Sequence, residues 1–252
     1  MSLANEQKKG YHQLVLRSIA MVCTILAIAS HTVAPTFRYL GYLEWIAFPI
    51  FAYLLAEGVE HSMSRALYGV RLAIFAALSE VPFNLMMSGR VSDFRQQNVI
   101  FTLFVGYLIL LAVDFVRVHG DNLILTLIAE LVGIYFGRYL MTGLRCAYSR
   151  YAMLFIMLFY VARRVHYEKL MEFIVVLFIA TTVSNQTFAT PKINGLQYDL
   201  SVQMFALVAL VLIWLYSGER GPNTLPVRYI SYGFFPVSIL IFWFLATQGV
   251  LY

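Results

Sequence analysis

Charged residues are scarce in this sequence: Asp, Glu, Lys and Arg make up only 12% of its 252 residues. A soluble domain usually has about 25% charged residues, so this chain has half the charge that normally covers a water-facing surface. Its hydrophobic share of 61% also excludes a disordered chain, because disorder requires low hydrophobicity. These absences indicate a polytopic membrane protein.

The sequence has only two cysteines, and it lacks the common motifs of soluble enzymes. The two cysteines, Cys23 and Cys146, belong to no Cys-x-x-Cys or Cys/His cluster, so neither a disulfide framework nor a metal site is predicted. P-loop, HExxH, GxSxG and GxGxxG motifs are missing, which removes the support for phosphoryl transfer and metal-dependent hydrolysis. The net charge of +5 comes from basic residues beside apolar runs, which indicates membrane topology and no nucleic-acid partner.

Nine apolar runs predict membrane-spanning helices, since one such helix takes about 20 residues. The predicted spans are Leu14–Ala34, Tyr42–Ala56, Tyr68–Met87, Val99–Val116, Leu123–Met141, Tyr151–Ala162, Leu170–Val183, Ser201–Tyr216 and Tyr229–Val250. The expected fold is an all-α transmembrane helical bundle, because the bilayer interior offers no water to satisfy an irregular backbone. No repeat or linker divides the chain, so residues 1–252 are predicted to form one integral-membrane domain. Eight spans are the alternative.

Basic residues predict the orientation of the bundle. With nine spans, Lys and Arg number eleven in the loops on the N-terminal side and seven on the other side. An excess of basic residues marks the cytoplasmic face, so we expect a cytoplasmic N-terminus. The first apolar run is long enough to span the membrane. We expect it to be an uncleaved membrane helix in contact with lipid, and not a signal peptide that is removed.

Polar residues inside the predicted spans are functional candidates, because a charge at mid-bilayer costs at least about 2.5–3.5 kcal/mol. His31 closes the first span. Glu57 and His61 are four residues apart, so both lie on one face of a helix. A carboxylate beside an imidazole raises its basicity, which suits a general base. The other interpretation is structural: a hydrogen-bonding histidine and an ion pair at the membrane interface.

Glu80 lies deep in the third span, close to Pro82 and Asn84. Proline frees backbone carbonyls in a helix, so polar groups there can line a cavity. Gln97 and Asn98 open the next span and could face the same cavity. These side chains are therefore predicted to bind a polar substrate, although they could equally bond one another across helices.

Two further intramembrane acids are predicted to be structural. Asp114 and Glu130 lie in the fourth and fifth spans, each with an arginine nearby in the sequence. Such acids snorkel or form ion pairs, and we expect Arg117 and Arg138 to be their partners.

The polar residues belong to an ordered series of motifs that begins at His31. The series continues as Ile46-Ala47-Phe48-Pro49-Ile50-Phe51-Ala52, Glu57-Gly58-Val59-Glu60-His61, Arg71-Leu72, Ser79-Glu80-Val81-Pro82-Phe83-Asn84 and Gln97-Asn98-Val99-Ile100-Phe101-Thr102-Leu103. It resembles the TraX family of polytopic membrane proteins, named for a conjugation-encoded enzyme that acetylates the N-terminus of pilin. The resemblance is dense over residues 14–115 and thin afterwards.

The resemblance implies an acyltransferase of the bacterial inner membrane. Such an enzyme would move an acetyl group from acetyl-CoA to a pilin-like N-terminus or another amine or hydroxyl acceptor. The implied catalytic residues are His31 as the base, with Ser30, Glu57 and His61, and the implied acetyl-CoA ligands are Arg17, Arg65 and Arg71. For such an enzyme, we expect His31, Glu57 and Glu80 to converge on one cavity.

The sequence also departs from the TraX pattern. The usual Asp-His is Ser30-His31, the basic residue eleven positions before the histidine is Ala20, Gly-Arg is Glu44-Trp45, and Asp-Tyr-Gly is Ala147-Tyr148-Ser149. These departures suggest a second hypothesis, an inactive binding or assembly protein that holds a pilin-like helix near Glu80 and Asn84. A proton-coupled transporter that uses Glu57 and Glu80 is a third.

Overall fold

The computed structural model describes residues 10–32, 35–120, 122–182, 187–189, 199–219, 221 and 224–248. In these ranges the chain forms nine α-helices, two short 3-10 helices and a two-stranded antiparallel sheet. The elements are α1 (Gln13–Thr32), η1 (Pro35–Leu43), α2 (Glu44–His61), α3 (Arg65–Ser88), α4 (Val99–Gly120), α5 (Leu123–Gly143), α6 (Ala152–Ala162), α7 (Glu168–Thr182), β1 (Thr187–Ala189), β2 (Asp199–Ser201), η2 (Val202–Met204), α8 (Phe205–Trp214) and α9 (Leu225–Thr247). The predicted span ends at Ala34, Val183 and Val250 lie outside the described residues.

Six helical segments in the described part of the chain are long and apolar enough to cross a membrane. They are α1, Thr36–His61, α3, α4, α5 and Tyr229–Thr247. Helices α6 and α8 are apolar but short, and the eleven residues of α6 are only about 16 Å long. The predicted all-α bundle is therefore confirmed, whereas nine spans stays a prediction.

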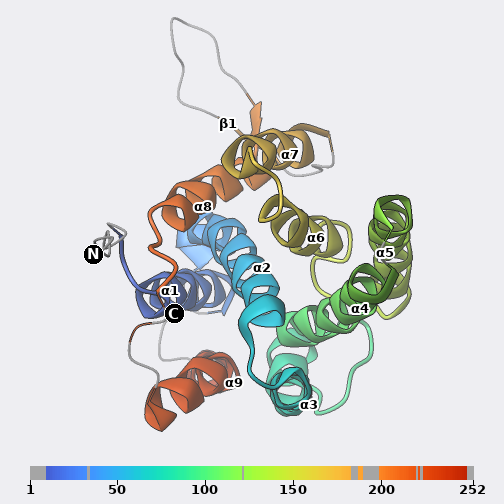
Figure 1. The fold of residues 1–252 in the computed structure, drawn as a ribbon. Helices are drawn as coiled ribbons and strands as arrows, with labels where there is room; N and C mark the ends of the chain where they lie inside the picture. The colour runs from blue at the N-terminus through green and yellow to red at the C-terminus, as the bar shows by residue number, and fades with distance from the viewer. Residues whose placement is uncertain are drawn as a thin grey trace, which may run out of the picture.

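Helix α2 lies in the middle of the bundle and packs against α1, α4, α6 and α8 (Figure 1). Helix α9 packs against α1 and α3, while α5 and α7 cover the outside. Short connections make successive helices antiparallel. We call the two ends of the bundle the Gln13 end, where α1 begins and α2 ends, and the His31 end, where α1 ends and α2 begins.

Burial differs sharply between neighbouring helices. Helix α6 is apolar on every side, and nearly all of its residues are buried, as expected for a helix surrounded by others. Helix α5 instead exposes large apolar side chains such as Leu131 and Tyr135, which is typical of a lipid-facing helix. A Cβ atom on Gly137 would lie 2.7 Å from Cγ of Met153, so glycine permits the close approach of α5 to α6.

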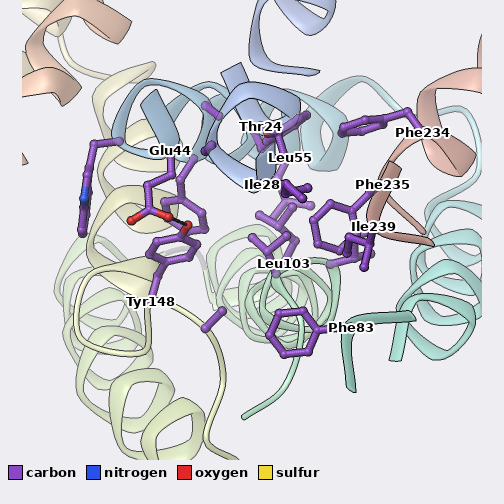
Figure 2. Close-up of a pocket in the computed structure, with 18 of the residues that line it drawn as sticks. Thr24, Ile28, Glu44, Leu55, Phe83, Leu103, Tyr148, Phe234, Phe235 and Ile239 are labelled. Atoms are coloured by element: carbon purple, nitrogen blue, oxygen red, sulfur yellow. Dashed lines mark hydrogen bonds between the residues drawn. The ribbon is translucent and has the colours of Figure 1, made fainter. Parts of the chain in front are cut away.

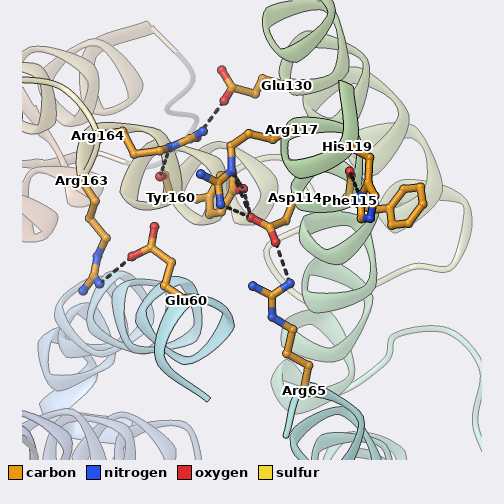
Figure 3. A network of polar contacts seen from close by, with 10 residues as sticks. All are labelled: Glu60, Arg65, Asp114, Phe115, Arg117, His119, Glu130, Tyr160, Arg163 and Arg164. Carbon is orange, nitrogen blue, oxygen red and sulfur yellow. Dashed lines mark hydrogen bonds and ion pairs between the residues drawn. The ribbon is translucent and has the colours of Figure 1, made fainter. Parts of the chain in front are cut away.

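Buried ion pairs join the helices at the Gln13 end (Figure 3). The fully buried Asp114 of α4 accepts hydrogen bonds from Arg65 at 2.7 Å, Arg117 at 2.6 Å and the Tyr160 hydroxyl at 2.6 Å. A buried carboxylate needs such partners, because an unpaired charge is costly away from water. The predicted pairing of Asp114 with Arg117 is therefore observed, and Arg65 joins it.

Glu130 has a partner that the sequence did not indicate. Its carboxylate accepts from Arg164 at 2.7 Å, and Arg164 follows α6, far from Glu130 in the sequence (Figure 3). Arg138 was expected in this place. Arg163, beside Arg164, donates to Glu60 of α2 at 3.3 Å. Together these pairs connect α2, α4, α5 and the end of α6.

Candidate functional site

A cavity of about 980 Å³ lies among α1, α2, α3, α4 and α9. Most of its wall is apolar, with Ile28, Leu55, Leu103, Phe83 and Phe235 pointing into it (Figure 2). Its polar lining residues include His31, Glu44, Gln96, Tyr148 and Arg150 at the His31 end and Arg17, Tyr68, Ser231 and Tyr232 towards the Gln13 end. Arg17 and His31 are fourteen residues apart on α1, which corresponds to about 21 Å.

His31 occupies the last turn of α1, where its side chain lines the cavity. The ring lies against Gly41 of η1, since a Cβ there would be 3.1 Å from both Cε1 and Nε2. The carboxylate of Glu44, the first residue of α2, lines the same cavity, and the charge of His31 acts on it from beyond ion-pair distance. Ser30 donates its hydroxyl to the Ala27 carbonyl at 2.8 Å, so that proton is directed into α1.

Tyr148 holds the Glu44 carboxylate from the loop before α6 (Figure 2). Its hydroxyl donates to Oε2 of Glu44 at 2.9 Å. Burial, together with the adjacent carboxylate, raises the pKa of Tyr148 well above its usual value, so the phenol stays protonated and donates. The backbone of Tyr148 has φ 56°, a left-handed conformation that is strained for a residue with a side chain.

Backbone pairing fixes this loop to the start of α4. The Gln97 amide donates to the Arg145 carbonyl at 2.9 Å, and the Ala147 amide donates to the Gln97 carbonyl at 3.2 Å. The Thr102 hydroxyl also donates to the Ala147 carbonyl at 2.9 Å. Gln97 therefore contributes to the site through its main chain, by placing Tyr148.

Glu80 and Asn98 bond one another across α3 and α4, as the second interpretation of these residues allowed. The Asn98 amide donates to the Glu80 carboxylate and, at 2.9 Å, to the Ala76 carbonyl. Glu80 borders a separate small pocket of about 160 Å³ between the same two helices. Asn84 donates to the Val91 carbonyl at 3.5 Å. These contacts lie outside the lining of the large cavity.

Glu57 is bound from two other helical segments at the Gln13 end. Its Oε2 accepts from Nε2 of Gln13 at 2.7 Å, and its Oε1 accepts from the Tyr216 hydroxyl at 2.9 Å. Nδ1 of His61 lies 3.2 Å from the backbone carbonyl of Glu57. The carboxylate of Glu57 thus faces α1 and the end of α8. His31, Glu57 and Glu80 do not converge on one cavity.

The three arginines implied as acetyl-CoA ligands are separated in the structure. Arg17 lines the cavity. Arg65 is paired with Asp114, and Nε of Arg71 donates to the Leu67 carbonyl at 3.0 Å on its own helix. Of the three, Arg17 has the placement that a ligand in the cavity requires.

A sequence model of the TraX family matches residues 13–246, nearly the whole chain. The chain belongs to the TraX family. The match extends well beyond residues 14–115, where the TraX motifs are dense, and TraX membership makes the chain a conjugation-related membrane protein. No curated protein and no solved structure matches it.

Of two departures from the TraX pattern, Glu44 lines the cavity, whereas the Ser30 side chain is turned into its own helix. The chain has Ser30 where TraX proteins usually have an aspartate, and Glu44 where they usually have glycine. The structure places Glu44 in the wall of the same cavity as His31, so α2 brings a carboxylate to the site, although it lies beyond ion-pair distance from the imidazole. Glu44 and Tyr148 are 104 positions apart and lie in no preserved motif, so sequence spacing gives no sign that they meet.

Metal ions in proteins are held by groups of side chains such as His, Cys, Asp and Glu. Among residues 10–248 as far as they are described, no three His, Cys, Asp or Glu side chains form a group that could hold a metal ion. The polar groups that line the cavity at the His31 end include His31 and Glu44. These groups can move a proton and orient an imidazole.

Proposed function

We propose that this TraX-family protein is an integral-membrane acyltransferase. It would move an acetyl group from acetyl-CoA to the N-terminus of a pilin-like protein, or to another amine or hydroxyl acceptor, in the bacterial inner membrane. The main support is the cavity, which has His31 at one end and Arg17 towards the other. Its volume of about 980 Å³ lies at the upper end of the range for ligand sites, about 300–1,000 Å³.

The donor would enter from the Gln13 end, which we place on the cytoplasmic side. Arg17 would bind a phosphate of acetyl-CoA, because the guanidinium group matches phosphate geometry. The apolar wall, including Leu55 and Leu103, would surround the pantetheine arm. A separation of about 21 Å between Arg17 and His31 suits an extended molecule with its anionic part at one end and its thioester at the other.

The acceptor would react at the His31 end. His31 would remove a proton from the attacking amine or hydroxyl, which forms a bond to the thioester carbon as the carbon–sulfur bond breaks. The same imidazole would return the proton to the departing thiolate. Glu44, held by Tyr148, would stabilise the protonated form of the imidazole through its negative charge.

Glu44→Gln is expected to lower the turnover number about 10- to 100-fold with little change in KM, because the amide cannot stabilise the protonated His31. Glu168→Gln is the matched control, since Glu168 begins α7 and lies outside the cavity lining. Initial rates of label transfer from acetyl-CoA would measure both variants. Equal losses in the two would contradict the role of Glu44.

The proposed function is tested with purified protein in liposomes that enclose a pilin-like peptide. Labelled acetyl-CoA is added outside, and we expect acetyl label on the peptide together with one released CoA thiol per acetyl group. Protein-free liposomes control for leakage. The proposal would be wrong if the protein in these liposomes labelled no peptide and bound no acetyl-CoA, whether acetyl-CoA was added outside or enclosed inside.

A binding or assembly protein without chemistry is the second candidate. It is favoured by the failure of His31, Glu57 and Glu80 to converge on one cavity, and by the hydrogen bonds that hold Ser30, Glu57 and Glu80 within the protein. Its expected result in the same liposomes is capture of the pilin-like peptide without acetyl-CoA binding or acetyl transfer. Peptide labelling separates the two functions directly.

A further inference from the structure

Gln13 connects two of the polar residues at the Gln13 end. Its side-chain Nε2 donates to Oε2 of Glu57 at 2.7 Å, and its Oε1 accepts from Nη2 of Arg17 at 3.2 Å. Gln13 and Arg17 are one turn apart on α1, whereas Glu57 comes from α2. The amide therefore bridges the central helix of the bundle to the arginine in the cavity wall.

The chemistry of Glu57 fixes the direction of this bridge. An ionised carboxylate only accepts hydrogen bonds, so it turns the NH₂ group of Gln13 towards itself and leaves the amide oxygen for Arg17. Glu57 is only 8% exposed and is itself held by the Tyr216 hydroxyl at 2.9 Å. Arg163 lies 3.8 Å from the same carboxylate and compensates its charge.

Arg17 is held from a second direction by α9. Its Nη1 donates to the Ser231 hydroxyl at 3.4 Å, and both residues line the cavity. A guanidinium group has five N–H donors, so the contacts with Gln13 and Ser231 fix its plane without using its full donor set. An arginine whose rotamer is already fixed loses less conformational entropy when it binds an anion.

We infer that Gln13 is a positioning residue which, with Glu57 and Tyr216 behind it, presents Arg17 to a phosphate group of the acyl donor. The inference rests on the proposed function, since it names the part of the donor that this end of the cavity recognises. Glu57 thereby has a role at the donor end of the cavity, remote from His31. The ligand class is a phosphate ester carried on a long, largely uncharged arm.

The test compares two donors, acetyl-CoA and acetyl-pantetheine, of which only the first has the phosphates and the adenosine attached to them. Their dissociation constants are measured by calorimetry on the full chain in nanodiscs. Gln13→Leu is expected to weaken acetyl-CoA binding about 10-fold, the loss of one charge-assisted hydrogen bond, and to change acetyl-pantetheine binding less than about two-fold. Tyr216→Phe, which removes only the hydroxyl behind Glu57, is expected to give a smaller loss of the same kind.

A double-mutant cycle establishes whether Gln13 acts through Arg17. The variant that combines Gln13→Leu with Arg17→Gln is expected to bind acetyl-CoA as weakly as Arg17→Gln alone, because Gln13 no longer has a guanidinium group to position. Lys169→Gln is the control for lost positive charge. Lys169 is the second residue of α7, at the same end of the bundle, and its Nζ lies 5.9 Å from the centre of the Trp214 ring, outside the cavity lining.

Each other outcome has a distinct meaning. Equal weakening of both donors by Gln13→Leu would overturn the inference, since a structural change does not distinguish phosphates. Additive losses in the double variant, or equal affinity of the unaltered protein for both donors, would overturn it and leave the acyltransferase proposal intact. Failure of the unaltered protein to bind either donor would overturn the proposed function and the inference together.

Discussion

His31→Ala is expected to lower acetyl transfer about 10³-fold, which makes it the most damaging single change to the proposed activity. His31 is the histidine in the cavity wall, and Glu44 is the carboxylate that interacts with it. Removal of the imidazole leaves no group beside Glu44 that can take the proton of the acceptor. Initial rates of peptide labelling measure the loss, and acetyl-CoA binding is expected to stay within about two-fold because Arg17 is unchanged.

His119→Ala provides the matched control. His119 lies in the last turn of α4, where its Nδ1 is 2.9 Å from the Phe115 carbonyl and its ring stacks on Phe115. This histidine is exposed and lies outside the cavity lining, so its removal is expected to leave the labelling rate unchanged. Labelling that persists in His31→Ala would eliminate His31 as the base.

Asp114→Ala is expected to lower the free energy of unfolding by about 3–5 kcal/mol, because it leaves buried or half-buried positive charges without their partner. Asp114 is fully buried, and its removal would leave Arg65, Arg117 and the Tyr160 hydroxyl without the carboxylate to which they donate (Figure 3). Asp114→Asn keeps part of the hydrogen bonding and is expected to cost less. Reversible unfolding in mixed micelles with increasing SDS measures both variants.

Asp93→Ala is the control for Asp114→Ala, since both changes remove an aspartate that is paired with arginine. Asp93 lies in the loop between α3 and α4, where the Arg95 guanidinium lowers the pKa of the carboxyl. Its partner Arg95 has a side chain that is 70% exposed, so water replaces the lost contact. The unfolding midpoint is expected to move much less than in Asp114→Ala. Similar shifts for both variants would contradict the structural role of the buried cluster.

The helices could be predicted from sequence because long apolar runs determine where a chain enters and leaves the bilayer. The prediction Leu123–Met141, for example, corresponds closely to α5, Leu123–Gly143. Local pairing was also predictable, since Asp114 and Arg117 are three residues apart on one helix face. The partner of Glu130 was not, because Arg164 reaches it from another helix and sequence spacing carries no information about that approach.

The candidate site was predictable only in part, for the same reason. The spacing of Glu57 and His61 suggested a pair, yet the carboxylate of Glu57 bonds to Gln13 and Tyr216, which lie far away in the sequence. A helical spacing shows that two side chains can meet, but tertiary packing decides whether they do. Glu44 was overlooked because its significance depends on His31 and Tyr148, neither of which is its neighbour in the sequence.

The strained backbone of Tyr148 has an evolutionary consequence. Glycine adopts a φ of 56° without steric conflict, so a change to glycine would relieve backbone strain on the order of 1 kcal/mol. Glycine has no hydroxyl, however, and the Glu44 carboxylate would lose the donor that holds it at 2.9 Å. Selection for stability alone would therefore favour glycine here, and selection for the cavity would favour tyrosine. The chain has the less stable residue at this position, which fits a site where activity and stability conflict.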